Sequence, residues 1–240
     1  MRRIILRTLV LSACIVAMNC GKSNPTSPDA STPAPGGGGS GGTGGTGATA
    51  ITTDDTFSDS DWDDEVQTFG AGGTGGGGHL SFNGQAGAGP SYRQITITVN
   101  NAGSGSAAQV AVFAIKRGAV YFPPSDGAIF SIGYSESSIN QSSGNGQYSA
   151  PAIRQNGKLY TLVPGGKAFS TPEPTWTDHS LTGLTQNDFR TIASAADHPD
   201  FSASGGRIEV GFMRLYTVQA GGNGGTVKGG IDNYRLTLFR

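Results

Sequence analysis

The feature that most constrains the fold of this chain is a series of short runs. In each run, apolar or β-branched residues alternate with polar ones. Clusters of glycine, asparagine, serine and proline separate the runs. Alternation with a period of two is the pattern of strands that bury one face, and turn residues mark where such strands end. With weaker runs at 55–62, 79–82 and 176–181, about ten strands are expected, as in two-sheet sandwiches. The clearest runs are residues 92–99, 109–115, 128–134, 148–154, 158–163, 207–213 and 231–238.

One helix is expected, over residues 184–193. Thr185 would cap its N-terminus, and Asp188 would lie in its first turn, where a negative charge is favoured. Asn156 and Gly157, between two runs, predict a type I′ hairpin, because both turn residues must accept a positive φ. The chain lacks the repeat of 20–50 residues that marks propellers and solenoids. The sequence therefore predicts an all-β domain, a jelly-roll β-sandwich of about ten antiparallel strands with one short helix.

The first residues are typical of an export signal rather than of the fold. A basic start, with Arg2, Arg3 and Arg7, precedes an apolar run over residues 8–18 that is too short to span a bilayer. Both cysteines lie in or just after this run, so the exported domain would stand without disulfides. We expect a lipoprotein signal peptide at 1–20, a flexible linker at 21–50 and a β-sandwich domain at 51–240. The linker is rich in proline, glycine, serine and threonine and cannot bury apolar surface.

A cysteine that closes an export signal and precedes a polar stretch resembles the lipobox of bacterial lipoproteins, in which that cysteine carries the lipid. Two registers compete. Residues 11–14, ending at Cys14, match the usual pattern closely but would leave an apolar stretch on the mature end. Residues 16–20, ending at Cys20, have the better position, and we take Cys20 as the lipidated residue. Plain secretion with two incidental cysteines is the alternative.

Composition excludes several classes of protein. Charged residues make up 14% of the chain, against roughly 25% in ordinary soluble domains, which disfavours coiled coils and charged helical bundles. A net charge of −1 disfavours nucleic acid as a partner, because neutralising phosphates requires clustered lysine and arginine. The three histidines are isolated from one another and from the cysteines, which makes a zinc site improbable.

Two short motifs resemble the bacterial jelly-roll domains of the concanavalin A/laminin G-like and carbohydrate-binding-module kind. The predicted domain opens on Asp55, Phe57 and Trp62, and its last run contains Gly230, Ile231 and Asp232 followed by asparagine. The resemblance covers about residues 51–240. It implies a β-sandwich that binds sugar.

The same resemblance implies a structural calcium ion shared by Asp55 and Asp232, one near the first strand and one on the last. The alternative is a solvated acidic edge and an Asp232 that bonds local backbone N–H groups. Seven of the chain's 17 acids fall within twelve residues around Asp55, and carboxylates this close repel unless a cation or solvent screens them. They are Asp54, Asp55, Asp59, Asp61, Asp63, Asp64 and Glu65.

Sugar binding on a sandwich calls for exposed aromatic rings beside amides or carboxylates, because pyranose faces stack on rings. The aromatic candidates are Trp62, Trp176, Tyr121, Phe122, Tyr134 and Tyr148. Trp176, Tyr121 and Phe122 are predicted to bind the ligand, because prolines beside them make these rings hard to bury. Burial in the core is the alternative for every one of them, and it is what we expect of Trp62.

The sequence predicts a non-catalytic lipoprotein of the cell envelope, held at the outer membrane or cell surface, that binds polysaccharide or another envelope component. A structural or adhesive protein that docks on protein partners is one alternative. A glycan-processing enzyme is another, and it would need Glu136 and Glu209 about 5–9 Å apart.

Overall fold

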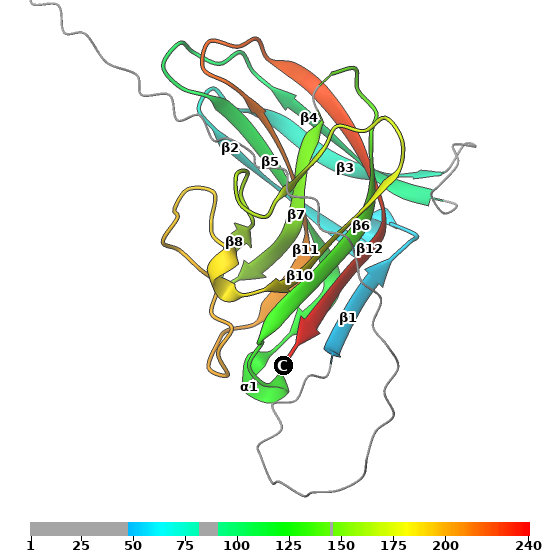
Figure 1. Cartoon of the computed structure of the whole chain (residues 1–240), viewed down its shortest axis with the longest axis vertical. Coiled ribbons are helices and arrows are strands. Elements are labelled where there is room, and N and C mark those ends of the chain that lie inside the picture. The colour runs from blue at the N-terminus through cyan, green and yellow to red at the C-terminus, as the bar shows by residue number, and fades with distance from the viewer. Residues whose placement is uncertain (1–47, 82–90, 145) are drawn as a thin grey trace, which may run out of the picture. The chain divides into compact units, whose positions relative to one another are not determined.

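The computed structural model describes residues 48–81, 91–144 and 146–240. The predicted signal peptide, Cys14, Cys20 and the linker up to residue 47 lie outside the described residues. The described part belongs to one compact unit, Gly44–Arg240, whose strands pair antiparallel in two six-stranded sheets (Figure 1). It is an all-β sandwich, as the sequence predicts.

Sheet A has the strand order β10-β6-β12-β4-β3, and β1 also pairs with β12. The long strand β12 pairs with β6 along one edge, while its other edge pairs first with β4 and then with β1. The strands of sheet A are β1 (Ala48–Asp54), β3 (Gly73–Ser81), β4 (Ser91–Val99), β6 (Ser131–Asn140), β10 (Thr177–Leu184) and β12 (Gly225–Phe239).

Sheet B has the strand order β2-β5-β11-β7-β8, and β9 also pairs with β7. Its central strand β11 lies between β5 and β7. The strands of sheet B are β2 (Trp62–Phe69), β5 (Ala108–Tyr121), β7 (Gln147–Gln155), β8 (Lys158–Thr161), β9 (Phe169–Thr171) and β11 (Ile208–Val218). The predicted hairpin turn is confirmed: Asn156 and Gly157 join β7 to β8 with φ of 52° and 74°.

The helix predicted over 184–193 is wrong. β10 continues to Leu184, a 3-10 turn η2 spans Gln186–Asp188, and the backbone of Arg190 then pairs with Thr161 as an isolated bridge. The predicted cap is present, because Thr185 and Asp188 form a capping box around this turn. This segment pairs with β6 at Leu184 and with β8 at Arg190, and that pairing outweighs the helix propensity of its residues. The short helices elsewhere are α1 (Pro123–Asp126), which follows Phe122, and a 3-10 turn η1 (Asp59–Asp61).

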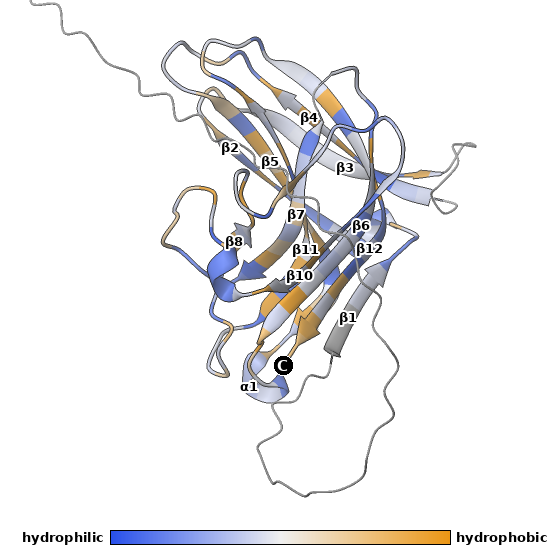
Figure 2. Ribbon diagram, viewed as in Figure 1, coloured by the Kyte–Doolittle hydropathy of each residue, from blue (hydrophilic) through white to orange (hydrophobic). Residues whose placement is uncertain are grey.

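The core fills the space between the sheets with the inward faces of alternating strands. In β4, Ile95, Ile97 and Val99 are buried and the residues between them are half-exposed. Trp62 is buried at the centre, as expected, stacked on Phe57 and edge-on to Phe212 and Tyr234. Figure 2 shows the hydrophobic residues along β5, β11 and the C-terminal part of β12.

The glycine-rich strand β3 lies close to the opposite sheet. A Cβ atom on Gly75 would lie 2.5 Å from a methyl carbon of Val112 on β5, so a side chain there would force the strands apart. The glycines that weaken the alternation of apolar and polar residues in this segment are therefore needed for the close packing of β3 on β5.

No helix among the described residues is long and apolar enough to cross a membrane.

A buried ion pair joins the two sheets. Arg214 on β11 donates from Nη2 to Oε1 of Glu136 on β6 at 2.8 Å, and both side chains are 0% exposed. Hydroxyl groups complete the shell of the carboxylate: those of Tyr134 and Ser138 donate to it, and that of Ser149 donates at 2.9 Å.

Replacing Arg214 with methionine leaves the Glu136 charge buried without its partner, and we expect the free energy of unfolding to fall by about 3–5 kcal/mol. The double variant Arg214→Met/Glu136→Gln removes both charges and should recover part of that loss. Urea denaturation measures both, with Arg235→Met, at an exposed arginine, as the control. A double variant no more stable than Arg214→Met would contradict this account of the pair.

Candidate ligand-binding site

The floor of the candidate site is the outer face of sheet B. Phe212 and Arg214 of β11 point toward sheet A, where they contact Tyr234 and Glu136. Because side chains alternate along a strand, Met213, Leu215 and Thr217 lie on the opposite face. The register places Gln109 of β5 opposite Thr217, and Tyr148 of β7 opposite Leu215. These side chains therefore share the outer face.

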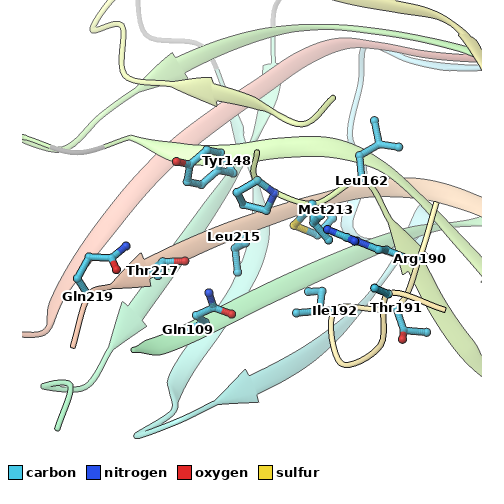
Figure 3. A pocket seen from close by; sticks show the side chains of 13 residues that line it. Gln109, Tyr148, Leu162, Arg190, Thr191, Ile192, Met213, Leu215, Thr217 and Gln219 are labelled. Atoms are coloured by element: carbon cyan, nitrogen blue, oxygen red, sulfur yellow. The ribbon is translucent and has the colours of Figure 1, made fainter. Parts of the chain in front are cut away.

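The connection from η2 to β11, residues 189–207, builds one wall over this floor. The backbone of Arg190 is held against β8, where its N–H donates to the carbonyl of Thr161 at 3.0 Å and its carbonyl accepts from the Thr161 N–H at 2.9 Å. The result is a cavity of about 380 Å³ between wall and floor. Its size lies within the range of about 300–1,000 Å³ that is common for small-ligand sites. Its lining also includes Leu162, Val163, Pro164, Thr191, Ile192, Ala195 and Gln219 (Figure 3).

Polar groups surround an apolar base in this cavity. Met213 and Leu215 are buried beneath it. Five polar side chains line it without donating or accepting a side-chain hydrogen bond or forming an ion pair within the described part of the chain. They are Gln109, Tyr148, Arg190, Thr217 and Gln219. Figure 3 shows them arranged around Met213 and Leu215. Toward the rest of the described chain, the donors and acceptors of these five side chains are unused.

A second hollow of similar volume, on sheet A, is lined by Ser137, Asp178, His179 and Asn233 among others. Its polar groups bond one another, since the Ser137 hydroxyl donates to Asp178 at 2.5 Å and accepts from the Asn233 amide at 3.0 Å. His179 stacks on Phe169, and burial lowers the pKa of its imidazole. This hollow offers fewer free groups than the cavity on sheet B.

The structure brings none of the three residues predicted to bind ligand into the cavity. Tyr121 is only 3% exposed and donates its hydroxyl to the carbonyls of Asp126 and Gly127, so the expectation that its ring is exposed is wrong. The prolines after it form α1 and close the loop instead of exposing the ring. Phe122 is 47% exposed, as expected, beside this helix.

Trp176 is half-buried on the sheet A side of the domain, edge-on to Tyr92 at 5.4 Å between ring centroids. Its indole N–H is buried and has no hydrogen-bond acceptor within the described residues. A role in sugar binding for Trp176 and Phe122 stays a prediction. Tyr148, an aromatic candidate that nothing in the sequence favours over the others, does line the cavity.

The two predicted calcium ligands differ in their surroundings. Asp55 is exposed, whereas Asp232 is buried and accepts a hydrogen bond from the Asn233 N–H at 2.7 Å. Within the described residues, no group of three or more histidine, cysteine, aspartate or glutamate side chains is placed to hold a metal ion. A calcium site at Asp55 and Asp232 stays a prediction.

The neighbouring Asp54 is the buried acid of this cluster. It is buried and accepts hydrogen bonds from Lys116 Nζ at 2.5 Å, from the indole N–H of Trp62 at 3.0 Å and from the Phe57 N–H at 2.8 Å. Burial raises the pKa of the carboxyl, but the hydrogen bonds from Lys116 and the backbone outweigh it and lower the pKa to about 2. An ammonium group thus neutralises this carboxylate.

The two glutamates that a glycan-processing enzyme would need are each ion-paired with different arginines. Glu136 is enclosed between the sheets with Arg214, while Glu209 on β11 is bound by Arg154 at 2.7 Å and by Arg207 at 2.9 Å. They share none of these partners, and neither lines the cavity on sheet B. The contacts of Glu136 and Glu209 therefore do not support the carboxylate pair that the enzyme alternative would need.

The described residues form a β-sandwich domain with a candidate ligand cavity on the outer face of sheet B. No protein-family model matches the chain, and a search of curated proteins found no match. Solved structures that match the chain include carbohydrate-binding modules.

One is the family 11 carbohydrate-binding module from Clostridium thermocellum in complex with a β-1,3-1,4-mixed-linked tetrasaccharide, at 14% identity and a TM-score of 0.46 over 79% of this chain and 96% of that one. Another is a xylan-binding domain from Paenibacillus barcinonensis, at 8% identity and a TM-score of 0.35 over 81% and 96%. At these identities and TM-scores neither structure identifies a ligand for this chain, and the ligand must be argued from the chain's own residues.

Asp54 provides a test of the acidic edge by pH. A carboxyl whose pKa is lowered from 3.8 to about 2 by folding contributes about 2 kcal/mol of stability above pH 4, which is lost as the pH falls toward 2. We expect this decrement in wild-type protein and its absence in Asp54→Asn, which should also be less stable at pH 7. Denaturant titrations at several pH values measure it.

Asp55→Asn is the matched control, and at this exposed position we expect a change within about 0.5 kcal/mol. Wild-type protein stabilised by added calcium, with Asp55→Asn unresponsive, would instead support the calcium prediction. Equal losses in the free energy of unfolding for Asp54→Asn and Asp55→Asn would contradict the role assigned to Asp54.

Proposed function

We propose that this chain is a non-catalytic glycan-binding protein of the cell envelope, and that the cavity on sheet B is its binding site. The observation that carries the proposal is the set of unbonded polar side chains around an apolar base. A sugar ring has a face of C–H groups and a rim of hydroxyls. Met213 and Leu215 suit the C–H face, while the amides of Gln109 and Gln219 suit the hydroxyls.

The absence of carboxylates supports binding rather than hydrolysis. Glycoside hydrolysis uses two carboxyl groups on either side of the bond that is cleaved. None of the described residues that line the cavity is an aspartate or a glutamate. The site can hold a glycan, but it presents no side chain with the acidity needed to protonate the leaving oxygen.

The membrane association is a separate proposal that rests on the sequence. We expect the lipid on Cys20, with the following linker giving the domain reach from the outer membrane or cell surface. Cys20→Ser should move the protein from the membrane fraction to the soluble fraction, whereas Cys14→Ser should leave it anchored. The reverse pattern would place the lipid on Cys14, and release by neither change would contradict lipid anchoring.

Calorimetric titration of the full chain with a panel of neutral and acidic oligosaccharides tests the binding site. Tyr148→Ala removes a ring from the cavity and should weaken binding about tenfold, the effect of losing a buried aromatic contact worth about 1.4 kcal/mol. Trp176→Ala, on the sheet A side, tests the competing prediction from the sequence, and a site in the sheet B cavity requires that it leave the affinity unchanged.

If Trp176→Ala abolishes binding and Tyr148→Ala does not, the site lies on sheet A. If no glycan binds the wild-type chain, the proposed function is wrong. The protein-docking alternative then gains weight, with exposed Phe122 and Phe130 as the surface to examine.

A further inference from the structure

Arg190 is the charged side chain in the lining of the cavity, and no carboxylate among the described residues pairs with it. It is half-buried, and among the described residues its guanidinium forms no ion pair and donates no hydrogen bond. The other arginines that are shielded from solvent behave differently. Arg93, Arg154 and Arg214 are each ion-paired with at least one carboxylate.

The acids nearest to Arg190 along the wall are already engaged. Asp188 pairs with Lys167 at 2.8 Å, and Asp197 pairs with Lys158 at 2.9 Å. Meanwhile the backbone bridge to Thr161 fixes the position of Arg190, and Figure 3 shows its side chain extending over Met213 into the cavity. The fold therefore holds this positive charge in the site, and no acid of the described ranges pairs with it.

A guanidinium that loses part of its hydration without gaining a partner is unfavourable, so an anion that enters the cavity recovers that free energy. The planar fork of N–H donors matches a carboxylate with two parallel hydrogen bonds, and it also binds sulfate. We propose that the cavity selects acidic glycans, with Arg190 binding the carboxylate of a uronic acid or a sulfate ester. This inference rests on the proposed function, since it names the ligand class of the same site.

The test compares three ligand series by calorimetric titration of the full chain: oligogalacturonates, sulfated galactan oligosaccharides and neutral gluco-oligosaccharides of equal length. We expect an acidic series to bind at least tenfold more tightly than the neutral one, with an affinity that falls as salt is added. Preference for the uronates or for the sulfated series identifies which anion Arg190 binds.

Arg190→Gln removes the charge and leaves a shorter, neutral amide. It should weaken acidic-glycan binding about 10- to 100-fold and weaken neutral-glycan binding by a much smaller factor. Arg190→Lys, which keeps the charge but not the fork, should fall between the two. Arg235→Gln is the control, because it makes the same charge change at an exposed position outside the cavity lining.

The outcomes separate the two proposals. If neutral glycans bind as tightly as acidic ones, or if Arg190→Gln and Arg235→Gln weaken binding equally, selection by Arg190 is wrong and the binding site can stand. If no glycan of any series binds, the proposed function fails and this inference fails with it.

Discussion

The ion pair between Arg214 and Glu136 is the interaction on which the rest of the domain depends. It joins the central strand of sheet B to sheet A, in an environment where an unpaired charge would be strongly destabilising. With Arg214 fixed inward, alternation along β11 directs Met213, Leu215 and Thr217 outward. The floor of the candidate site therefore follows from the register that the buried pair enforces. Hydroxyls of Ser138 and Ser149, from the two sheets, complete the carboxylate's shell.

A second electrostatic arrangement holds the N-terminal edge. The acidic cluster around Asp55 would repel itself, yet basic side chains from neighbouring strands reach most of its members. Arg93 pairs with Asp59 and Asp64, and Arg154 pairs with Asp63 and Glu65. Lys116 pairs with Asp54 and approaches Asp61. Guanidinium and ammonium groups thus supply counter-charge at this edge, where the sequence alone suggested a cation or solvent.

The architecture could be predicted from the sequence because the alternation of apolar and polar residues and the choice of turn residues are local features. The hairpin at Asn156 and the burial of Trp62 were predictable for this reason. The helix at 184–193 was not correctly predicted, because Phe189 is drawn into the core beside Phe201 and Arg190 pairs with β8. The full length of β3 was not predicted, because its glycines show no alternation of apolar and polar side chains.

The candidate site was less predictable than the fold. Gln109, Arg190 and Gln219 lie far apart in the chain, and only the pairing of β5 with β11 and the path of the 189–207 connection bring them together. Tyr121 was misjudged because the rule that prolines keep nearby rings exposed ignores hydrogen bonding by the tyrosine hydroxyl. Among the residues that line the cavity, Tyr148 was the one that the sequence offered as an aromatic candidate, at the start of a clear strand.

The most direct test of the central claim is a two-dimensional NMR titration of the isotope-labelled full chain with oligouronates and with neutral gluco-oligosaccharides. The account predicts that backbone amide shifts change around Gln109, Tyr148, Arg190, Thr217 and Gln219, with the sheet A side around Tyr92 and Trp176 unaffected. Shift changes centred on Tyr92 and Trp176, or no change with any glycan, would contradict it.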